Sequence, residues 1–334
     1  MNPHDPRPRL RLRTVDDALG LIPHLLGFHP QDSLVVLVVD AGVVAVTARV
    51  DLADTSAPDG AEAVLARIWR RFPAADAWFV AYTTDRELGW SVLERCDAFL
   101  GGGACRRLTL VDRDTWYADR PGGPHGRHDP TSSPMAAEAT VHGLVARPSR
   151  ADLAALLDGP PAAELAGLGD LAERAGAELS GQRDTRWAGL MGQALREYRS
   201  RQRLTDEEAA RFAILAAHPD ARDVALLAMS RPDAAHHLEL WRRVVNRTPP
   251  LHQGYALALL GMAAWITGEG ALASICLERA EVLVPESYLV GILSHVTDAV
   301  VPPSVWDELR PGLLATARAP IRRAVLRPAS PSGR

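Results

Sequence analysis

The chain has 334 residues, of which 47% are hydrophobic, and its formal net charge is −4 at pH 7. Lysine is absent and all 37 basic residues are arginine, which excludes the chemistry of pyridoxal-phosphate enzymes, P-loop NTPases and ordinary protein kinases, because each of these needs a lysine amine. The acidic balance makes nucleic acid an unexpected partner, and the length predicts two domains.

The sequence contains no apolar run long enough to span a membrane, and it begins with charged and proline-rich residues. These features predict no membrane association and a cytoplasmic location. The sequence has three cysteines, Cys96, Cys105 and Cys276. They are too far apart to be paired zinc ligands and too few for a disulfide framework, so reduced, mostly buried thiols are expected. No cofactor is expected either. Residues 1–8 and 327–334 are predicted to be disordered tails.

The N-terminal part predicts helices alternating with strands. Thr14 and Asp17 resemble a capping box that starts a short helix ending near Leu21, with Pro23 interrupting it and Gly27 closing a last turn. Residues 33–39 and 43–50 predict a β-hairpin. Helices at 61–72 and 86–100 and strands at 77–82 and 106–111 follow, which indicates an α/β layer with mixed strand directions.

Two further segments complete this first domain. Residues 120–134 are turn formers throughout and predict a long surface loop. Residues 135–145 are predicted to form a last strand. The expected α/β domain therefore spans residues 9–148.

No credible strand follows residue 148, so the fold class is α+β or α/β: a mixed-sheet α/β domain followed by an all-α domain at 149–326. Ser149 and Asp152 cap its first helix. The remaining helices are predicted at 162–179, 185–201, 206–217, 220–229, 233–245, 251–267, 271–284, 288–299 and 304–309.

A candidate ligand cleft lies where the predicted strands begin and end. His29 and Asp32 precede the first strand, and Asp85 follows a later one. Arg49 and Asp51 are two residues apart and should point to the same face of the sheet. The alternative is that residues 29–33 are only the turn into a strand, and that strand ends are polar because they meet water.

Two other polar clusters are interpreted as solvated surface rather than as sites. The sequence HGRHD at 125–129 is read as a solvated loop, since it lacks a third histidine or a cysteine for metal binding. The arginines at 196–203 are read as a solvated helix end that compensates the helix dipole. The alternative is a nucleic-acid contact through Arg196, Arg199, Arg201 and Arg203, which the net charge disfavours. The motifs HExxH, GxSxG, GxGxxG and paired CxxC are all absent.

Two resemblances add to these observations. LALLGMAAWITGEGALASICLERAEVLVPES resembles one tetratricopeptide repeat, in which Gly261, Ala273 and Ala280 let two helices pack closely. DALGLIPHLLGFHPQDSLVVLVV, ARVDL, RPSRADL, AAWITGEGALASICLERAEVLVPESYL and PPSVW, in this order, resemble the bacterial domain of unknown function family 4192, which is common in actinobacteria. The family's CCP-like cysteine stretch is replaced here by WYADRPGGPHGRHDP, which has no cysteine.

Neither resemblance implies an activity. The absence of these catalytic motifs and the repeat-like helices favour a non-enzymatic protein-binding or adaptor module whose partner contacts the helical domain. The alternative is an undescribed enzyme or small-molecule binder that uses the polar cleft of the α/β domain.

Overall fold

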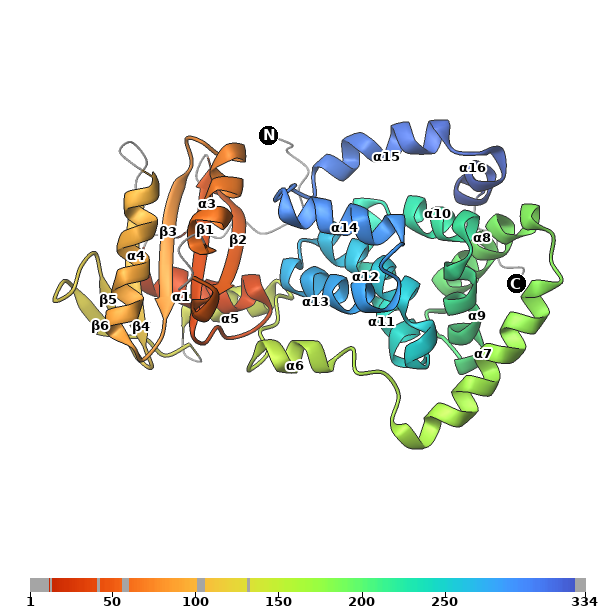
Figure 1. Cartoon of the computed structure of the whole chain (residues 1–334), viewed down its shortest axis with the longest axis horizontal. Helices are drawn as coiled ribbons and strands as arrows, with labels where there is room; N and C mark the ends of the chain where they lie inside the picture. The colour runs from red at the N-terminus through yellow and green to blue at the C-terminus, as the bar shows by residue number, and fades with distance from the viewer. Residues whose placement is uncertain are drawn as a thin grey trace. The chain divides into compact units, whose positions relative to one another are not determined.

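The computed structural model describes Leu12 and residues 14–40, 43–55, 60–100, 106–130 and 133–327. The chain divides into two compact units (Figure 1). The N-terminal unit comprises Met1–Leu153 with Asp298–Pro302, and the helical unit comprises Ala154–Thr297 with Pro303–Arg334. Of the predicted tails, residues 1–8 and 328–334 lie outside the described residues.

The N-terminal unit contains a mixed sheet in the order β2-β1-β3-β4-β5-β6. Its strands are β1 (Ser33–Asp40), β2 (Val43–Asp51), β3 (Asp76–Tyr82), β4 (Arg106–Asp112), β5 (Thr115–Ala118) and β6 (His125–Arg127). β1 and β2 form the predicted antiparallel hairpin, and β3 and β4 are parallel. The mixed strand directions expected from the sequence are confirmed.

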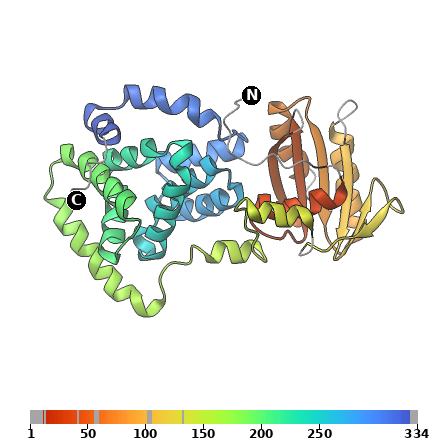
Figure 2. The same ribbon diagram turned by 180° about the vertical axis from the view of Figure 1, so that it is seen from behind.

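Helices cover both faces of this sheet (Figures 1 and 2). α3 (Gly60–Arg71) and α4 (Arg86–Leu100) pack on one face, where the alternate β1 residues Leu34, Val36 and Val38 form the main core. α1 (Val15–Leu26) and α5 (Pro134–Val141) lie on the opposite face, and the short α2 (Leu52–Thr55) follows β2. The near-continuous apolar sequence of β1 reflects burial on both faces.

The first helix confirms its predicted start but not its predicted end. The Thr14 side chain accepts a hydrogen bond from the Asp17 amide at 3.1 Å, and the Thr14 amide donates to the Asp17 carboxylate at 3.0 Å. Helix α1 continues through Pro23 to Leu26, and Gly27 then adopts φ 79°. Burial of the turns around Pro23 holds the helix despite the missing backbone donor.

The region after β4 differs from its prediction. The expected surface loop contains β6, and the preceding β5 was not predicted. The expected strand at 135–145 is wrong, because residues 134–141 form helix α5. Ser133 accepts a hydrogen bond from the Ala136 amide as the N-cap, and Pro134 occupies the first turn, where its missing N–H costs nothing.

The helical unit contains no strand among its described residues. Its helices are α7 (Leu165–Ser180), α8 (Asp184–Arg201), α9 (Asp206–Ala217), α10 (Pro219–Ala228), α11 (Ala234–Asn246), α12 (Gly254–Thr267), α13 (Gly270–Leu283), α14 (Tyr288–Asp298), α15 (Val305–Thr316) and α16 (Ala319–Leu326). They follow α6 (Arg150–Ala155), which Ser149 and Asp152 cap as predicted. Residues 256–266 of α12 are buried throughout, so α12 forms the centre of this unit.

Three helix predictions need correction. Residues 162–164 form a 3₁₀ turn before α7, rather than the start of one long helix. Helix α15 extends through Pro311 to Thr316, well beyond the predicted end at 309, and α16 was not predicted. No helix in the described part of the chain is both long and apolar enough to cross a membrane.

Candidate functional site

The start of β1 and the ends of β2, β3 and β4 lie together at one end of the sheet. Ser33, the first residue of β1, is opposite Asp51 at the end of β2 and Tyr82 at the end of β3. Tyr82 in turn is opposite Val111 of β4. Because directly opposite residues share a face, these side chains belong to the α1 face, away from the α3–α4 core. We call this place the strand-end edge.

Arg49 is held at the strand-end edge by its neighbours. Its Nη1 donates to Asp51 Oδ2 at 2.8 Å and its Nε donates to Ser33 Oγ at 2.9 Å. The guanidinium also lies 5.8 Å from the centre of the Phe28 ring. Arg49 and Asp51 therefore point to the same face, and Asp51 already neutralises the charge of Arg49.

The segment before β1 makes a turn and leaves one imidazole without a partner. The His29 amide donates to the Arg147 carbonyl at 2.9 Å, and Asp32 adopts φ 41° while its carbonyl accepts from the Leu52 amide. The Asp32 carboxylate is exposed. The His29 ring is half-buried and forms no hydrogen bond within the described part of the chain. Burial, with a smaller contribution from the charge of His24, lowers the pKa of His29.

His128 corrects the prediction that residues 125–129 form a solvated loop. Its side chain is only 7% exposed, and its Nδ1 lies 3.9 Å from Asp16 Oδ1, which accepts a hydrogen bond from Trp116 Nε1 at 3.1 Å. Its Nε2 is buried without a hydrogen-bond partner. Burial lowers the pKa of His128, Asp16 and Asp129 raise it, and His29 makes the smallest contribution, which lowers it. We call Asp16, His29 and His128 the histidine cluster.

Both clustered imidazoles are therefore neutral near pH 7, and each can donate one hydrogen bond and accept another. Tyr82, on the same face, also has a buried hydroxyl without a partner. The residues that the structure describes include no group of three His, Cys, Asp or Glu side chains arranged to hold a metal ion. Binding through hydrogen bonds, or proton transfer by a neutral imidazole, is the chemistry that this edge can support.

Asp85 has a structural role instead. Its carboxylate accepts a hydrogen bond from the Leu88 amide at 3.0 Å, which caps helix α4, and its own amide donates to Thr83 Oγ1. Of the sequence candidates, His29 lies near enough to His128 to lower its pKa, and Arg49 and Asp51 form an ion pair on the same face of the sheet. Asp32 lies exposed in the turn. His128, Asp16 and Tyr82 were not predicted as site residues.

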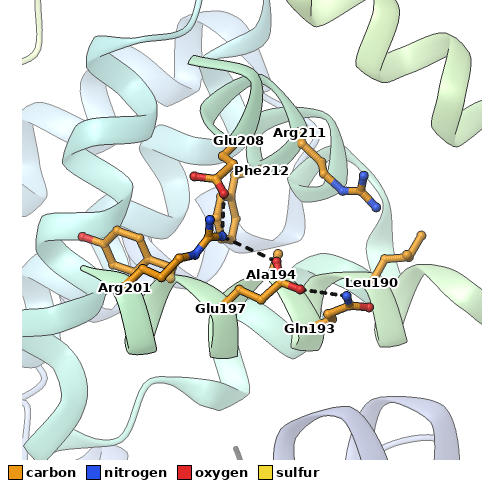
Figure 3. A pocket seen from close by; sticks show the side chains of 9 residues that line it. Leu190, Gln193, Ala194, Glu197, Arg201, Glu208, Arg211 and Phe212 are labelled. Carbon is orange, nitrogen blue, oxygen red and sulfur yellow. Dashed lines mark hydrogen bonds and ion pairs between the residues drawn. The ribbon is translucent and has the colours of Figure 1, made fainter. Parts of the chain in front are cut away.

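A separate cavity of about 250 Å³ lies between α8 and α9 in the helical unit (Figure 3). It is lined by Leu190, Gln193, Ala194, Glu197, Tyr198, Arg201, Glu208, Arg211 and Phe212. Several arginines at the end of α8 are engaged: Arg199 pairs with Asp233 at 2.7 Å, and Arg196 donates to the Ala324 carbonyl at 3.1 Å. These contacts tie the helix end to the rest of the unit.

The buried cysteines belong neither to the strand-end edge nor to the lining of the cavity between α8 and α9. Cys96 and Cys276 are free and buried, as predicted, and burial raises the pKa of both thiols. Cys105 lies outside the described residues. The thiols are therefore structural and poorly reactive.

Comparison with known proteins identifies a family but no activity. No curated protein and no solved structure matches the chain. The model of a family described as a domain of unknown function (DUF4192) matches residues 16–304, which include the sheet, the histidine cluster and most of the helical unit. The chain therefore belongs to the DUF4192 family.

Proposed function

We propose that the N-terminal unit binds a small molecule at the strand-end edge, through His29 and His128. The supporting observation is the buried, unpartnered Nε2 of His128. An unpaired buried polar atom costs about 1–3 kcal/mol. A ligand that supplies the missing hydrogen bond would recover this energy.

The position of the strand-end edge in the sheet is one where open α/β folds commonly bind ligands. Ligands in such folds bind beyond the carboxyl ends of parallel strands. β3 and β4 are the parallel pair here, and Tyr82 at the end of β3 carries a second buried polar atom without a partner. His29 reaches the same edge from the turn before β1.

The charges at this edge favour an uncharged or cationic ligand. The two imidazoles are neutral, and Asp51 compensates Arg49. The carboxylate of Asp16 is 59% exposed beside His128, so it adds negative potential. A molecule with hydroxyl or amine groups fits these surroundings better than an anion does.

Native mass spectrometry of the protein purified gently from its source cells tests this proposal. We expect a small additional mass that is lost on denaturation and is absent in His128→Gln. His142→Gln is the matched control, because His142 is exposed and ends α5 through its backbone only. A wild-type protein with no additional mass, or equal retention in His128→Gln, would contradict the proposal.

A second candidate function is binding of a protein partner through α15. Trp306 and Arg310 attach this helix to the helical unit by hydrogen bonds to the Met229 and Leu227 carbonyls. Leu309 and Leu313, four residues apart, are 52% and 46% exposed. Apolar side chains at this spacing suit an apolar groove on a partner.

Photo-crosslinking from position 313 tests this second candidate. A specific crosslinked polypeptide that disappears in Leu309→Glu would support it. Leu251→Glu is the control, since Leu251 is 84% exposed in a different part of the unit. Crosslinking that both variants reduce equally would contradict a role for α15.

A further inference from the structure

The cavity between α8 and α9 shares no residue with the strand-end edge, so it is a second, independent place for a ligand. Its lining combines an apolar part, which includes Leu190, Ala194 and Phe212, with two arginines and two glutamates. Which of these charged side chains already have ion-pair partners determines what the cavity can bind.

Arg201 is already neutralised and held in place. Its Nη2 donates to Glu208 Oε1 at 2.5 Å and lies 3.6 Å from Glu197 Oε2. Glu208 is fixed in turn by the capping box of α9, where its Oε2 accepts from the Thr205 amide at 3.0 Å. Glu197 also accepts a hydrogen bond from Gln193 at 2.8 Å. This network is complete without a ligand and forms one rigid wall of the cavity.

Arg211 is the exception. Glu207 and Glu208 precede it by four and three positions, which are the helical spacings at which ion pairs form. Nevertheless, no ion pair or hydrogen bond joins Arg211 to any residue in the described part of the chain. In Figure 3 its guanidinium lies towards Leu190, away from the ion pair of Glu208 with Arg201. The cavity therefore contains one half-buried guanidinium that has no hydrogen-bond or ion-pair partner among the described residues, beside an apolar surface.

We infer that this cavity binds a small monocarboxylate, with the carboxylate on the Arg211 guanidinium and an apolar body against the apolar lining. A guanidinium binds a carboxylate through two parallel hydrogen bonds. The two arginines and two glutamates of the lining carry charges that sum to zero, so a ligand with a single negative charge disturbs this balance least. A phosphate dianion would carry a second charge close to Glu197 and Glu208, which line the same cavity.

The size of the cavity limits the ligand. A volume of 250 Å³ equals that of about eight water molecules at roughly 30 Å³ each. This is smaller than the usual site for a drug-sized molecule, and it accommodates a molecule such as benzoate. Acetate would leave the apolar lining uncovered.

Nuclear magnetic resonance titration with benzoate, acetate and phosphate at equal ionic strength tests the inference. The arginine Nε–Hε signals report directly on the guanidinium. We expect benzoate to shift the Arg211 signal saturably, with acetate and phosphate binding at least tenfold more weakly. Arg211→Gln should weaken benzoate binding at least tenfold, while Arg203→Gln, which changes an exposed arginine outside the cavity, should leave it unchanged.

A second variant separates the cavity from a simple surface charge. Ala194→Met fills part of the cavity and keeps Arg211, so it should also weaken benzoate binding. Unchanged affinity in either Arg211→Gln or Ala194→Met would overturn the inference, as would phosphate binding tighter than benzoate. His128→Gln should not affect this titration, so the two ligand proposals can fail independently.

Discussion

Replacing Gly261 by alanine should destabilise the helical unit, although alanine is the better helix former. Gly261 lies in α12, at the point where α13 and α14 pack against it. An added Cβ would lie 2.4 Å from Leu293 Cδ2 and 3.1 Å from Cys276 Cβ. Both neighbouring residues are 0% exposed, so neither can move into solvent.

Two opposing effects set the magnitude. Replacing glycine by alanine inside a helix gains about 1 kcal/mol of backbone propensity. Overpacking a filled core costs about 1–3 kcal/mol, and the close approach to Leu293 places this site at the upper end. The free energy of unfolding should therefore fall by about 2 kcal/mol. Gly189→Ala in α8 is the control: it is exposed with no atom within 4 Å, so it should gain about 0.5–1 kcal/mol.

Urea unfolding followed by far-ultraviolet circular dichroism measures both variants. The midpoint should shift down for Gly261→Ala and up for Gly189→Ala, with the slope unchanged. A Gly261→Ala protein at least as stable as the wild type would refute the reasoning. It would mean that α12, α13 and α14 can separate slightly at little cost.

Three further predictions concern single side chains. His128→Phe removes the unpartnered nitrogen and should stabilise the ligand-free protein by about 1 kcal/mol in a thermal melt; destabilisation would mean that Nε2 is already hydrogen-bonded. Burial lowers the pKa of His237 from 6.5 to about 4, so the folded protein binds fewer protons than the unfolded chain between these values. Stability should fall by about 2 kcal/mol as the pH is lowered from about 6.5 to about 5, and urea midpoints of His237→Phe should lack this part of the pH dependence. Arg279 donates to the Ala154 and Leu157 carbonyls at 2.9 and 2.5 Å, so Arg279→Gln should accelerate hydrogen exchange in residues 154–158; unchanged exchange would show that other contacts hold this segment.

The parts of the fold that local sequence determines were predictable. The β1–β2 hairpin follows from two apolar runs separated by a turn, and the start of α1 follows from the pairing of Thr14 with Asp17. The errors fall where tertiary contacts override local signals. Pro23 stays inside α1 because the turns around it are buried. β5 forms because β4 offers it an edge to pair with, and β6 pairs with β5 in turn.

Part of the candidate site was predictable from local sequence, namely His29 in the turn before β1 and the Arg49–Asp51 pair on β2. Arg49 and Asp51 share a face because side chains alternate along β2. His128 follows a segment rich in glycine and proline, and nothing in that composition indicates burial. Its environment arises from pairing of β6 with β5 and from the position of Asp16 on α1, about 110 residues away in sequence.

Asp85 and His128 show which structural test separates a site residue from a structural one. Asp85 has the residue type and position of a site residue, but its carboxylate accepts a hydrogen bond from the Leu88 amide in the first turn of α4. His128 resembles a loop residue in the sequence, yet its Nε2 is buried with its hydrogen-bonding capacity unused. Arg201 and Arg211 repeat the contrast in the helical unit, since one is fully paired and the other is not. Unsatisfied hydrogen-bonding capacity, rather than residue type, is therefore what supports His128 and Arg211 as ligand contacts.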